Sequence, residues 1–333
     1  MSERIVVFGH GPVGAATTRQ LLRTGAEVVV AQRSRPADLP AGVGFQPCDV
    51  LDAEAVRTAA AGAQQIVVAI GFPYEGKVWA TAWPRAMTHL VAACEATGAR
   101  MVFVDNLYMY GLQTVPLTEE MPARSFGRKP RARTEATKIW RAASDAGRIR
   151  ATALRPSDFF GPGVRATQLG DAAFGALARG KAAGLVLPPD LPHDFSYVPD
   201  IARAVATLVA APDSDFGQVW HCPNAPIRTP RELLKLAADA LGVKLAIQGL
   251  PLWALPMLGL FSPQMRELVE MRYQWRRPYR VDSRKFGQRF WSDATPFEVS
   301  IPETARSFLS APSGRAEHRP SRAALSARPH RPG

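Results

Sequence analysis

The amino-terminal strand and turn constrain the fold of this chain more than any other feature. A short apolar run, Ile5–Phe8, leads into Gly9–Gly14 (GHGPVG), which has the Gly-x-Gly-x-x-Gly spacing. In a strand–turn–helix unit the first glycine permits the tight turn, the second lets the backbone approach a diphosphate, and the third allows close helix packing. The helix N-terminus then offers free N–H groups and partial positive charge to phosphates. We therefore expect a dinucleotide-binding turn, rather than a tight turn without a ligand, lined by Gly9, Gly11, Pro12, Val13 and Gly14.

Strand-like and helix-like patterns alternate over residues 1–155 with short connections. Repeated units of this length predict a parallel sheet with helices on both faces, a Rossmann-like doubly wound α/β domain. Residues 156–310 are expected to form a smaller substrate-binding portion, with later segments completing the sheet. Strands are expected at Ile5–Phe8, Glu27–Ala31, Gln65–Ile70, Met101–Asp105 and Arg150–Leu154, and helices at Ala15–Thr24, Ala53–Ala61, Trp79–Thr97 and Ala132–Ala146.

The alternation weakens after Arg155. Helices are expected at 166–179, 198–210 and 230–241, the last with Thr229 as N-cap and Glu232 three residues into the helix, a capping-box pattern. The segment Leu250–Phe261 is apolar and interrupted by proline, and it is too short to span a bilayer, which takes roughly 20 residues. We interpret it as a core or domain-packing segment, with a hydrophobic lid or a membrane-touching patch as alternatives.

The net charge of +12 raises the question of a nucleic-acid partner. Residues 311–333 carry five arginines against one glutamate and are rich in Pro, Ser, Ala and Gly, so a disordered basic tail is expected there. The remaining charge is spread widely, which favours an anionic small substrate or a phosphate-bearing cofactor over nucleic acid. Cys48, Cys94 and Cys222 have no metal-like spacing and indicate reduced thiols. With no secretion signal or membrane-spanning run visible, we expect a cytoplasmic protein without a metal.

The end of the second expected strand indicates which dinucleotide binds. An acidic residue there would hold the adenosine ribose 2′-hydroxyl of NAD. Arg33 and Ser34 stand there instead, and a guanidinium and a hydroxyl suit a 2′-phosphate, so NADP is favoured over NAD; a solvated loop arginine is the alternative. Further cofactor contacts are expected from Asp49 and Val50 at the adenine and from Ala69, Ile70 and Gly71 at the ribose and diphosphate.

Three further motifs carry a family resemblance. They are Val104–Gly111 (VDNLYMYG), Leu154–Gly163 (LRPSDFFGPG) and His193–Asp200 (HDFSYVPD). With the glycine turn they resemble the extended or atypical branch of the short-chain dehydrogenase/reductase superfamily, the NAD-dependent epimerase/dehydratase-like proteins, over about residues 4–305. The resemblance implies a Rossmann-like domain with a C-terminal substrate domain. It also implies a Tyr-x-x-x-Lys pair on one helix and a Ser or Thr one strand earlier.

The chain departs from this catalytic pattern. Counting back from Arg155, Lys129 stands at the tyrosine position and Arg133 at the lysine position; the alternative frame, Thr134 and Lys138, also lacks a tyrosine. Asp105 or Asn106 fills the serine position. Arg133 could still bind a ribose, but it cannot act as a base at physiological pH. Lys129 could act if burial lowered its pKa.

Other residues could take over the missing roles. The resemblance makes Tyr110 a structural residue, so Tyr108 is the preferred replacement acid, with a packed aromatic as the alternative for each. The candidate catalytic residues are Tyr108, Asn106, Lys129 and Arg133. The resemblance also places Pro156 and Ser157 at the nicotinamide, and Asp158, His193 and Tyr197 at the substrate.

Three functions fit these observations. We favour an NAD(P)-dependent oxidoreductase of the atypical short-chain type acting on a small hydroxyl or carbonyl compound, because the arginine-bearing cofactor loop indicates NADP. An epimerase or dehydratase on the same fold is the first alternative. A catalytically inactive dinucleotide sensor or scaffold is the second, since the Tyr–Lys pair is missing and a fold does not fix function. The protein is expected to be a monomer or a homodimer with a small-molecule substrate.

Overall fold

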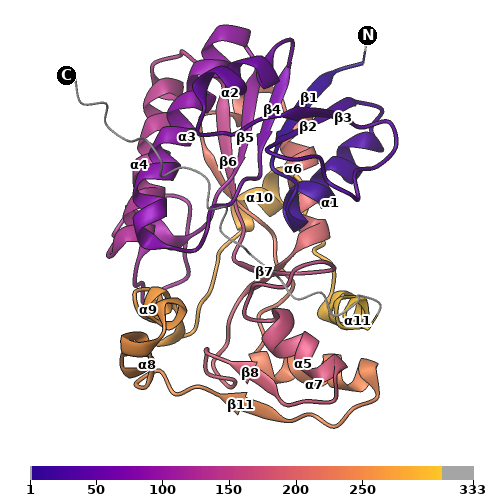
Figure 1. Cartoon of the computed structure of the whole chain (residues 1–333), viewed down its shortest axis with the longest axis vertical. Coiled ribbons are helices and arrows are strands. Elements are labelled where there is room, and N and C mark those ends of the chain that lie inside the picture. Colours follow the sequence, from indigo (N-terminus) through magenta and orange to yellow (C-terminus); the bar gives the residue numbers. More distant parts are fainter. Residues whose placement is uncertain (1, 310–333) are drawn as a thin grey trace, which may run out of the picture.

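A seven-stranded, fully parallel sheet forms the centre of the larger domain (Figure 1). The structure, a computed structural model, describes residues 2–309, so the expected basic tail at 311–333 lies outside the described residues. The strand order is β10-β6-β5-β4-β1-β2-β3. This confirms the expected Rossmann-like α/β fold. The strands are β1 (Arg4–Phe8), β2 (Glu27–Gln32), β3 (Gly44–Pro47), β4 (Gln65–Val68), β5 (Arg100–Val104), β6 (Ala151–Arg155) and β10 (Val219–His221).

Helices cover both faces of this sheet. Side chains alternate along a strand, so Val6 and Phe8 of β1 enter one core and Ile5 and Val7 the other. The first core is closed by α2 (Ala53–Ala60), α3 (Gly76–Thr97) and α4 (Arg128–Asp145), and the second by α1 (Pro12–Leu22) and α6 (Val198–Ala210) (Figure 1). Both α6 and β10 come from beyond residue 155, so later segments complete the nucleotide-type domain.

Helix boundaries differ from the expected ones at positions where glycine or proline sets the backbone conformation. Helix α1 begins at Pro12 rather than Ala15, because Gly11 is the N-cap and the fixed φ of proline suits the first helical position. Helix α4 begins at Arg128, four residues before the expected start, since Gly127 turns the chain with φ 93° and Pro130 is tolerated in the first turn. The helix expected over 166–179 is wrong in its first half. The N–H of Asp171 bonds to the Arg165 carbonyl, and only a π-turn (Gly170–Phe174) and α5 (Gly175–Ala178) follow.

The smaller domain lies below the carboxyl ends of the sheet strands in Figure 1. Two short parallel pairs, β7 (Asp158–Phe160) with β9 (Phe195–Tyr197) and β8 (Ala183–Leu185) with β11 (Ile247–Gly249), pack with α5, α7 (Pro230–Leu241) and α11 (Phe297–Ser307). The expected capping box at α7 is confirmed, with Thr229 and Glu232 satisfying each other's backbone. Further short elements of the described residues are the 3₁₀ turns η1 (Tyr108–Tyr110), η3 (Asp213–Asp215) and η4 (Arg272–Trp275), and helix α10 (Arg284–Arg289).

The apolar segment Leu250–Phe261 lies mostly on the surface. It contains α8 (Leu255–Phe261), which is followed by α9 (Pro263–Val269). Leu255 is buried, whereas Trp253, Leu260 and Phe261 are exposed, Phe261 by 88%. The interpretation as a core segment is therefore wrong for most of its length, because only one side of this short helix faces the protein. Within residues 2–309, no helix has the length and apolar character needed to cross a bilayer.

Candidate active site

The three glycines of the amino-terminal turn have different physical roles. Gly9 has φ +93°, and a Cβ there would lie 2.6 Å from the Ala69 carbonyl oxygen. A Cβ on Gly14 would lie 2.2 Å from the Gly9 carbonyl oxygen, so α1 can approach β1 only at a glycine. A Cβ on Gly11 would meet nothing within 4 Å. Gly9 and Gly14 thus shape the turn, while Gly11, the N-cap of α1, borders open space in front of free helix N–H groups, an arrangement that fits a diphosphate.

The end of β2 carries no acidic residue. The Gln32 amide accepts a hydrogen bond from the His10 N–H at 3.1 Å and donates one to the Ser34 carbonyl at 2.8 Å, which fixes the loop. Arg33 and Ser34 are exposed, and neither side chain has a hydrogen bond or ion pair with the described residues. The Arg33 guanidinium is therefore free to meet an anion at this edge.

His10 lies between Gly9 and Gly11 in the turn, and the glycine motif assigned it no role. Its side chain is 1% exposed, and neither ring nitrogen has a hydrogen-bond partner among the described residues. Burial lowers its pKa, so the ring is neutral at physiological pH. The Asp38 carboxylate stands 3.6 Å from Nε2, at the margin of contact.

The other expected cofactor residues follow the strands that border this edge. Ala69, Ile70 and Gly71 come directly after β4, and the Ala69 N–H bonds to the Phe8 carbonyl at 2.9 Å. Asp49 and Val50 follow β3; Asp49 accepts from the Leu51 N–H, and the Val50 carbonyl contacts His89 Nδ1 at 3.1 Å. Ala69 and Ile70 lie against Gly9, whereas Asp49 and Val50 lie at the same edge of the sheet, two strands away from β1.

Pro156 and Ser157 follow β6 and are buried. The Ser157 N–H donates to Ser196 Oγ at 3.0 Å, and the two hydroxyls also lie 3.0 Å apart. Ser196 in turn donates to Asn224 Oδ1 at 2.6 Å. Ser157 thereby links the large sheet to the smaller domain.

Lys129, at the family's tyrosine position, is fully buried and doubly ion-paired. Its Nζ lies 2.5 Å from a carboxylate oxygen of Glu267 and 2.5 Å from one of Glu270, and 4.6 Å from the centre of the Tyr74 ring. Lys138 of the alternative frame is exposed and pairs with Glu135 on the outer surface. The frame with Lys129 and Arg133 is therefore the one that faces the protein interior.

Glu267 and Glu270 also cap two helices of the large domain. Glu267 accepts from the Gly76 N–H at 2.8 Å at the start of α3, and Glu270 accepts from the Arg128 N–H at 2.9 Å at the start of α4. Burial by itself raises the pKa of Glu267, but hydrogen bonds from Lys129 and Gly76 lower it overall. Together these contacts hold α9 and the turn after it against the sheet domain. Sequence reasoning missed both glutamates, which lie about 140 residues from Lys129 and match no motif.

Replacing Lys129 with methionine is expected to lower the free energy of unfolding by about 3 kcal/mol, because two largely buried carboxylates would lose their counter-ion. The exposed pair of Lys235 and Asp239 supplies the control, and Lys235→Met should cost below about 0.5 kcal/mol. Urea titrations followed by circular dichroism measure both. A loss for Lys129→Met no larger than the control's would show that the carboxylates do not depend on this ammonium.

Arg133, at the family's lysine position, belongs to a buried network with Asp105. Its Nε donates to Asp105 Oδ1 at 2.8 Å, and its guanidinium lies 3.7 Å from the Trp83 ring centre. Arg155 Nε donates to Asp105 Oδ2 at 2.9 Å, and its Nη1 donates to the Tyr110 hydroxyl at 2.7 Å. One carboxylate thus balances two buried guanidiniums. The Tyr110 hydroxyl also lies 3.0 Å from His221 Nε2. With both of these partners, Tyr110 has the structural role that the resemblance implies.

Tyr108 is the first residue of η1, which follows β5, and aromatic side chains surround it. Its N–H donates to Asn106 Oδ1 at 3.1 Å, so the amide of Asn106 shapes this turn. Its ring stacks on Trp79, and its carbonyl accepts from the Tyr273 hydroxyl at 3.1 Å. Burial, followed by the charge of Asp158, raises the pKa of the Tyr108 phenol. Tyr108 is therefore protonated at neutral pH and can donate a hydrogen bond or a proton, but it is a poor base.

Two of the three expected substrate residues form a pair. Asp158 Oδ2 lies 2.9 Å from His193 Nε2, and the His193 ring stacks on Tyr279 with a centroid distance of 4.8 Å. The Asp158 charge also acts on the Tyr108 phenol, whose pKa it raises after burial. Tyr197 is buried in the core of the smaller domain, its ring packed on Phe160.

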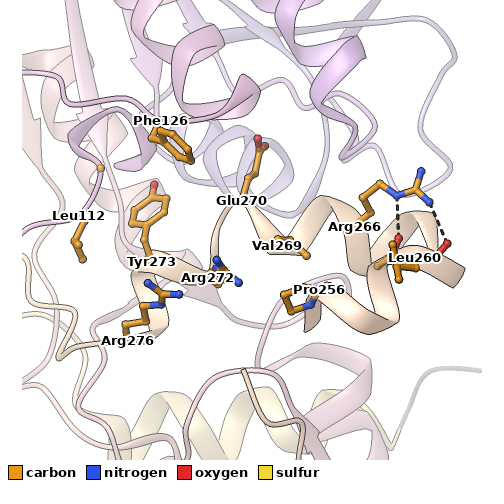
Figure 2. A pocket seen from close by; sticks show the side chains of 12 residues that line it. Leu112, Phe126, Pro256, Leu260, Arg266, Val269, Glu270, Arg272, Tyr273 and Arg276 are labelled. Atoms are coloured by element: carbon orange, nitrogen blue, oxygen red, sulfur yellow. Dashed lines mark hydrogen bonds between the residues drawn. The ribbon is translucent and has the colours of Figure 1, made fainter. Parts of the chain in front are cut away.

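A cavity of about 650 Å³ adjoins this region (Figure 2). It lies between the loop after η1 and the segment of α8, α9 and η4. Glu270 and Tyr273 line it, and through their bonds to Lys129 and to the Tyr108 carbonyl they join its wall to the candidate site. Among residues 2–309, no cluster of three or more His, Cys, Asp or Glu side chains could hold a metal ion.

Comparisons with known proteins agree with this architecture. The family model for the NAD dependent epimerase/dehydratase family matches residues 5–222. No curated protein sequence matches the chain. A Burkholderia cenocepacia J2315 protein, described only provisionally as an epimerase, is 20% identical with a TM-score of 0.76, over 93% of this chain and 99% of that one.

Two other solved structures are similar at this level. UDP-glucose 4-epimerase of Thermus thermophilus, in complex with NAD, is 19% identical with a TM-score of 0.73, covering 92% of this chain and 99% of that one. The dTDP-glucose 4,6-dehydratase DesIV of Streptomyces venezuelae, with NAD and TYD bound, is 18% identical with a TM-score of 0.74, covering 92% and 96%. Identities this low establish a common fold.

Proposed function

The chain belongs to the NAD dependent epimerase/dehydratase family, and from this premise we propose that it binds a nicotinamide dinucleotide and acts as an epimerase- or dehydratase-type enzyme on a hydroxyl compound. The observation that carries the proposal is the open space at Gly11, framed by the close packing of Gly9 and Gly14. Family membership supports this reaction class better than the net oxidoreductase that the arginine-bearing loop favoured.

The proposed roles follow from the contacts of each residue. The bound dinucleotide would supply a hydride acceptor and donor. The amides at the start of α1 hold its diphosphate. Tyr108, protonated and partly buried, donates to a substrate oxygen, and the pair of Asp158 and His193 orients a substrate hydroxyl. Lys129 and Arg133 have no proton-transfer role, because ion pairs with carboxylates keep both buried cationic side chains engaged.

Tyr108→Phe tests the central role. General acid catalysis contributes about 10²–10⁴-fold, so we expect kcat to fall at least about 100-fold while the dinucleotide Kd stays unchanged. Tyr197→Phe, at a tyrosine in the core of the smaller domain, is the control and should leave kcat within about twofold. Product formation from a panel of nucleotide sugars and simple hydroxy compounds, followed by NMR and by nicotinamide absorbance, measures both. An unchanged kcat for Tyr108→Phe would remove its assigned role.

A second function, a dinucleotide sensor without turnover, is favoured by one specific observation. Lys129 and Arg133 stand at the positions of the family's tyrosine and lysine. Both side chains are buried, and each is held in ion pairs. Tight dinucleotide binding with no product from any compound of the panel would support the sensor. Turnover of any of them would exclude it.

We also propose that NADP is preferred over NAD, on the strength of the free Arg33 guanidinium at the end of β2. Arg33→Asp should weaken NADP binding about 10- to 100-fold, the value of one charge-assisted hydrogen bond to phosphate, and change NAD binding little. Arg23→Asp makes the same charge change at the far end of α1 and is the control. Calorimetric titrations with both dinucleotides measure the difference. Equal weakening of NAD and NADP would contradict the preference.

A further inference from the structure

The cavity beside the candidate site has apolar walls and lacks the groups that bind sugars. Its apolar side chains are those of Leu112, Phe126, Pro256, Leu260 and Val269 (Figure 2). No Ser, Thr, Asn, Gln or His side chain lines it. A polyhydroxy compound needs several convergent donors and acceptors, since each buried hydroxyl without a partner costs free energy. The walls therefore favour an aliphatic or aromatic body.

The charge in this cavity is positive. Of its three arginines, Arg266 donates to the carbonyls of Gly259 and Leu260 at the end of α8. The guanidinium groups of Arg272 and Arg276 have no hydrogen bond or ion pair with any residue in 2–309, although Arg272 is only partly exposed. They stand four residues apart around η4, and both line the cavity (Figure 2).

The other polar groups of the lining offset this charge only in part, because Glu267 and Glu270 share the single Lys129 ammonium and leave one negative charge against the cavity's three arginines. Glu270 lies 2.5 Å from the Lys129 ammonium, and it also caps α4. The Tyr273 hydroxyl donates to the Tyr108 carbonyl. Two like charges on an apolar wall are unfavourable unless an anion pairs with them, and a guanidinium is suited to carboxylate and phosphate.

We infer that the cavity binds an amphipathic anion, a compound with an aliphatic or aromatic body and one carboxylate or phosphate group. The cavity's volume lies within the range of ligand pockets, about 300–1,000 Å³. Since Tyr273 and Glu270 of its wall bond to the Tyr108 carbonyl and to Lys129, we assign a hydroxylated compound of this kind as the substrate class of the candidate site, a step that rests on the proposed function.

Calorimetry with the full-length protein tests the inference. The probes are decanoate, decyl phosphate and decanol, each below its aggregation limit, so that the first two differ from the third only in the head group. Both anions should bind at least tenfold more tightly than decanol. Arg272→Gln and Arg276→Gln should each weaken the anions about tenfold and leave decanol unchanged. Arg277→Gln, an exposed neighbour outside this cavity, is the matched control and should change none of the three.

Several results would overturn the inference. They are equal affinity for decanol and decanoate, loss of anion binding in Arg277→Gln alone, and an absence of binding by all three probes. Flotation with phosphatidylglycerol vesicles separates a lipid surface from a monomeric ligand, and capture by vesicles without binding of the monomers also overturns it. Thermal melts accompany each variant; Arg276 is exposed, so its variant carries the test if Arg272→Gln unfolds.

Titration with NAD and NADP separates this inference from the proposed function. Dinucleotide binding without anion binding would defeat the cavity assignment alone. Anion binding that depends on Arg272 and Arg276 without dinucleotide binding would defeat the proposed function and leave the cavity assignment standing.

Discussion

Gly11→Val is expected to abolish measurable binding of both nicotinamide dinucleotides while the protein remains folded. A Cβ at residue 11 meets nothing within 4 Å, so a valine side chain occupies the open space in front of α1 without a clash. The backbone at Gly11 is extended, with φ −68° and ψ −176°, which valine adopts readily. The side chain would then stand where the amides must approach the diphosphate, and we expect Kd to rise at least 100-fold, about 2.7 kcal/mol.

Two other glycines provide the controls for this variant. Gly249 also has open space at its Cβ position but lies in β11, so Gly249→Val should retain full dinucleotide affinity. Gly14→Val should instead lose the fold, because its Cβ would lie 2.2 Å from a backbone oxygen. Calorimetric titration and thermal melts distinguish the three. Wild-type affinity in Gly11→Val would refute the assignment of the turn as a phosphate site.

Asp105→Ala should lower the free energy of unfolding by about 3–5 kcal/mol. The Asp105 carboxylate is buried and accepts hydrogen bonds from Arg133 and Arg155, both nearly inaccessible to water. Its removal leaves two guanidiniums in the core without a counter-charge. The network also links β5 to α4 and to the end of β6, so the geometry of the loop that carries Tyr108 should change with it.

Asp213 offers a matched comparison, because its carboxylate also pairs with two arginines, Arg100 and Arg150, but is 56% exposed. Asp213→Ala should cost below about 1 kcal/mol, since solvent screens the pairs. Urea unfolding of both variants measures the difference. Similar losses for Asp105→Ala and Asp213→Ala would show that burial of the network contributes nothing.

Local sequence patterns predicted the parts of the fold that depend on interactions between residues close in the chain. The glycine turn, the alternation of buried strands with helices and the capping box at Thr229 each involve residues a few positions apart, and all three are present in the structure. Helix starts shifted by three or four residues at Pro12 and Gly127, where backbone conformation outweighs hydrophobic pattern.

The candidate site was less accessible to such reasoning. The resemblance assigned Asp158 and His193 to the substrate, which stays a prediction, and the structure pairs the two side chains with each other. The motifs did not indicate that Lys129 would be enclosed by Glu267 and Glu270, or that Tyr197 would point into the smaller domain's core. Apolar composition suggested burial of Leu250–Phe261, yet most of α8 is exposed, because composition does not say which neighbours the chain will find.

The sequence by itself determined the alternation of strands and helices, the glycine turn and the absence of an acidic residue at the end of β2, because each depends on residues close in the chain or on residue identity alone. Only the tertiary structure decided which charged groups of the site are free. It placed two glutamates on Lys129 and an aspartate on Arg133, and it left Arg272 and Arg276 without partners among the described residues, in an apolar cavity. The reason is physical: the state of a charged side chain depends on burial and on counter-ions that long-range folding alone brings within reach.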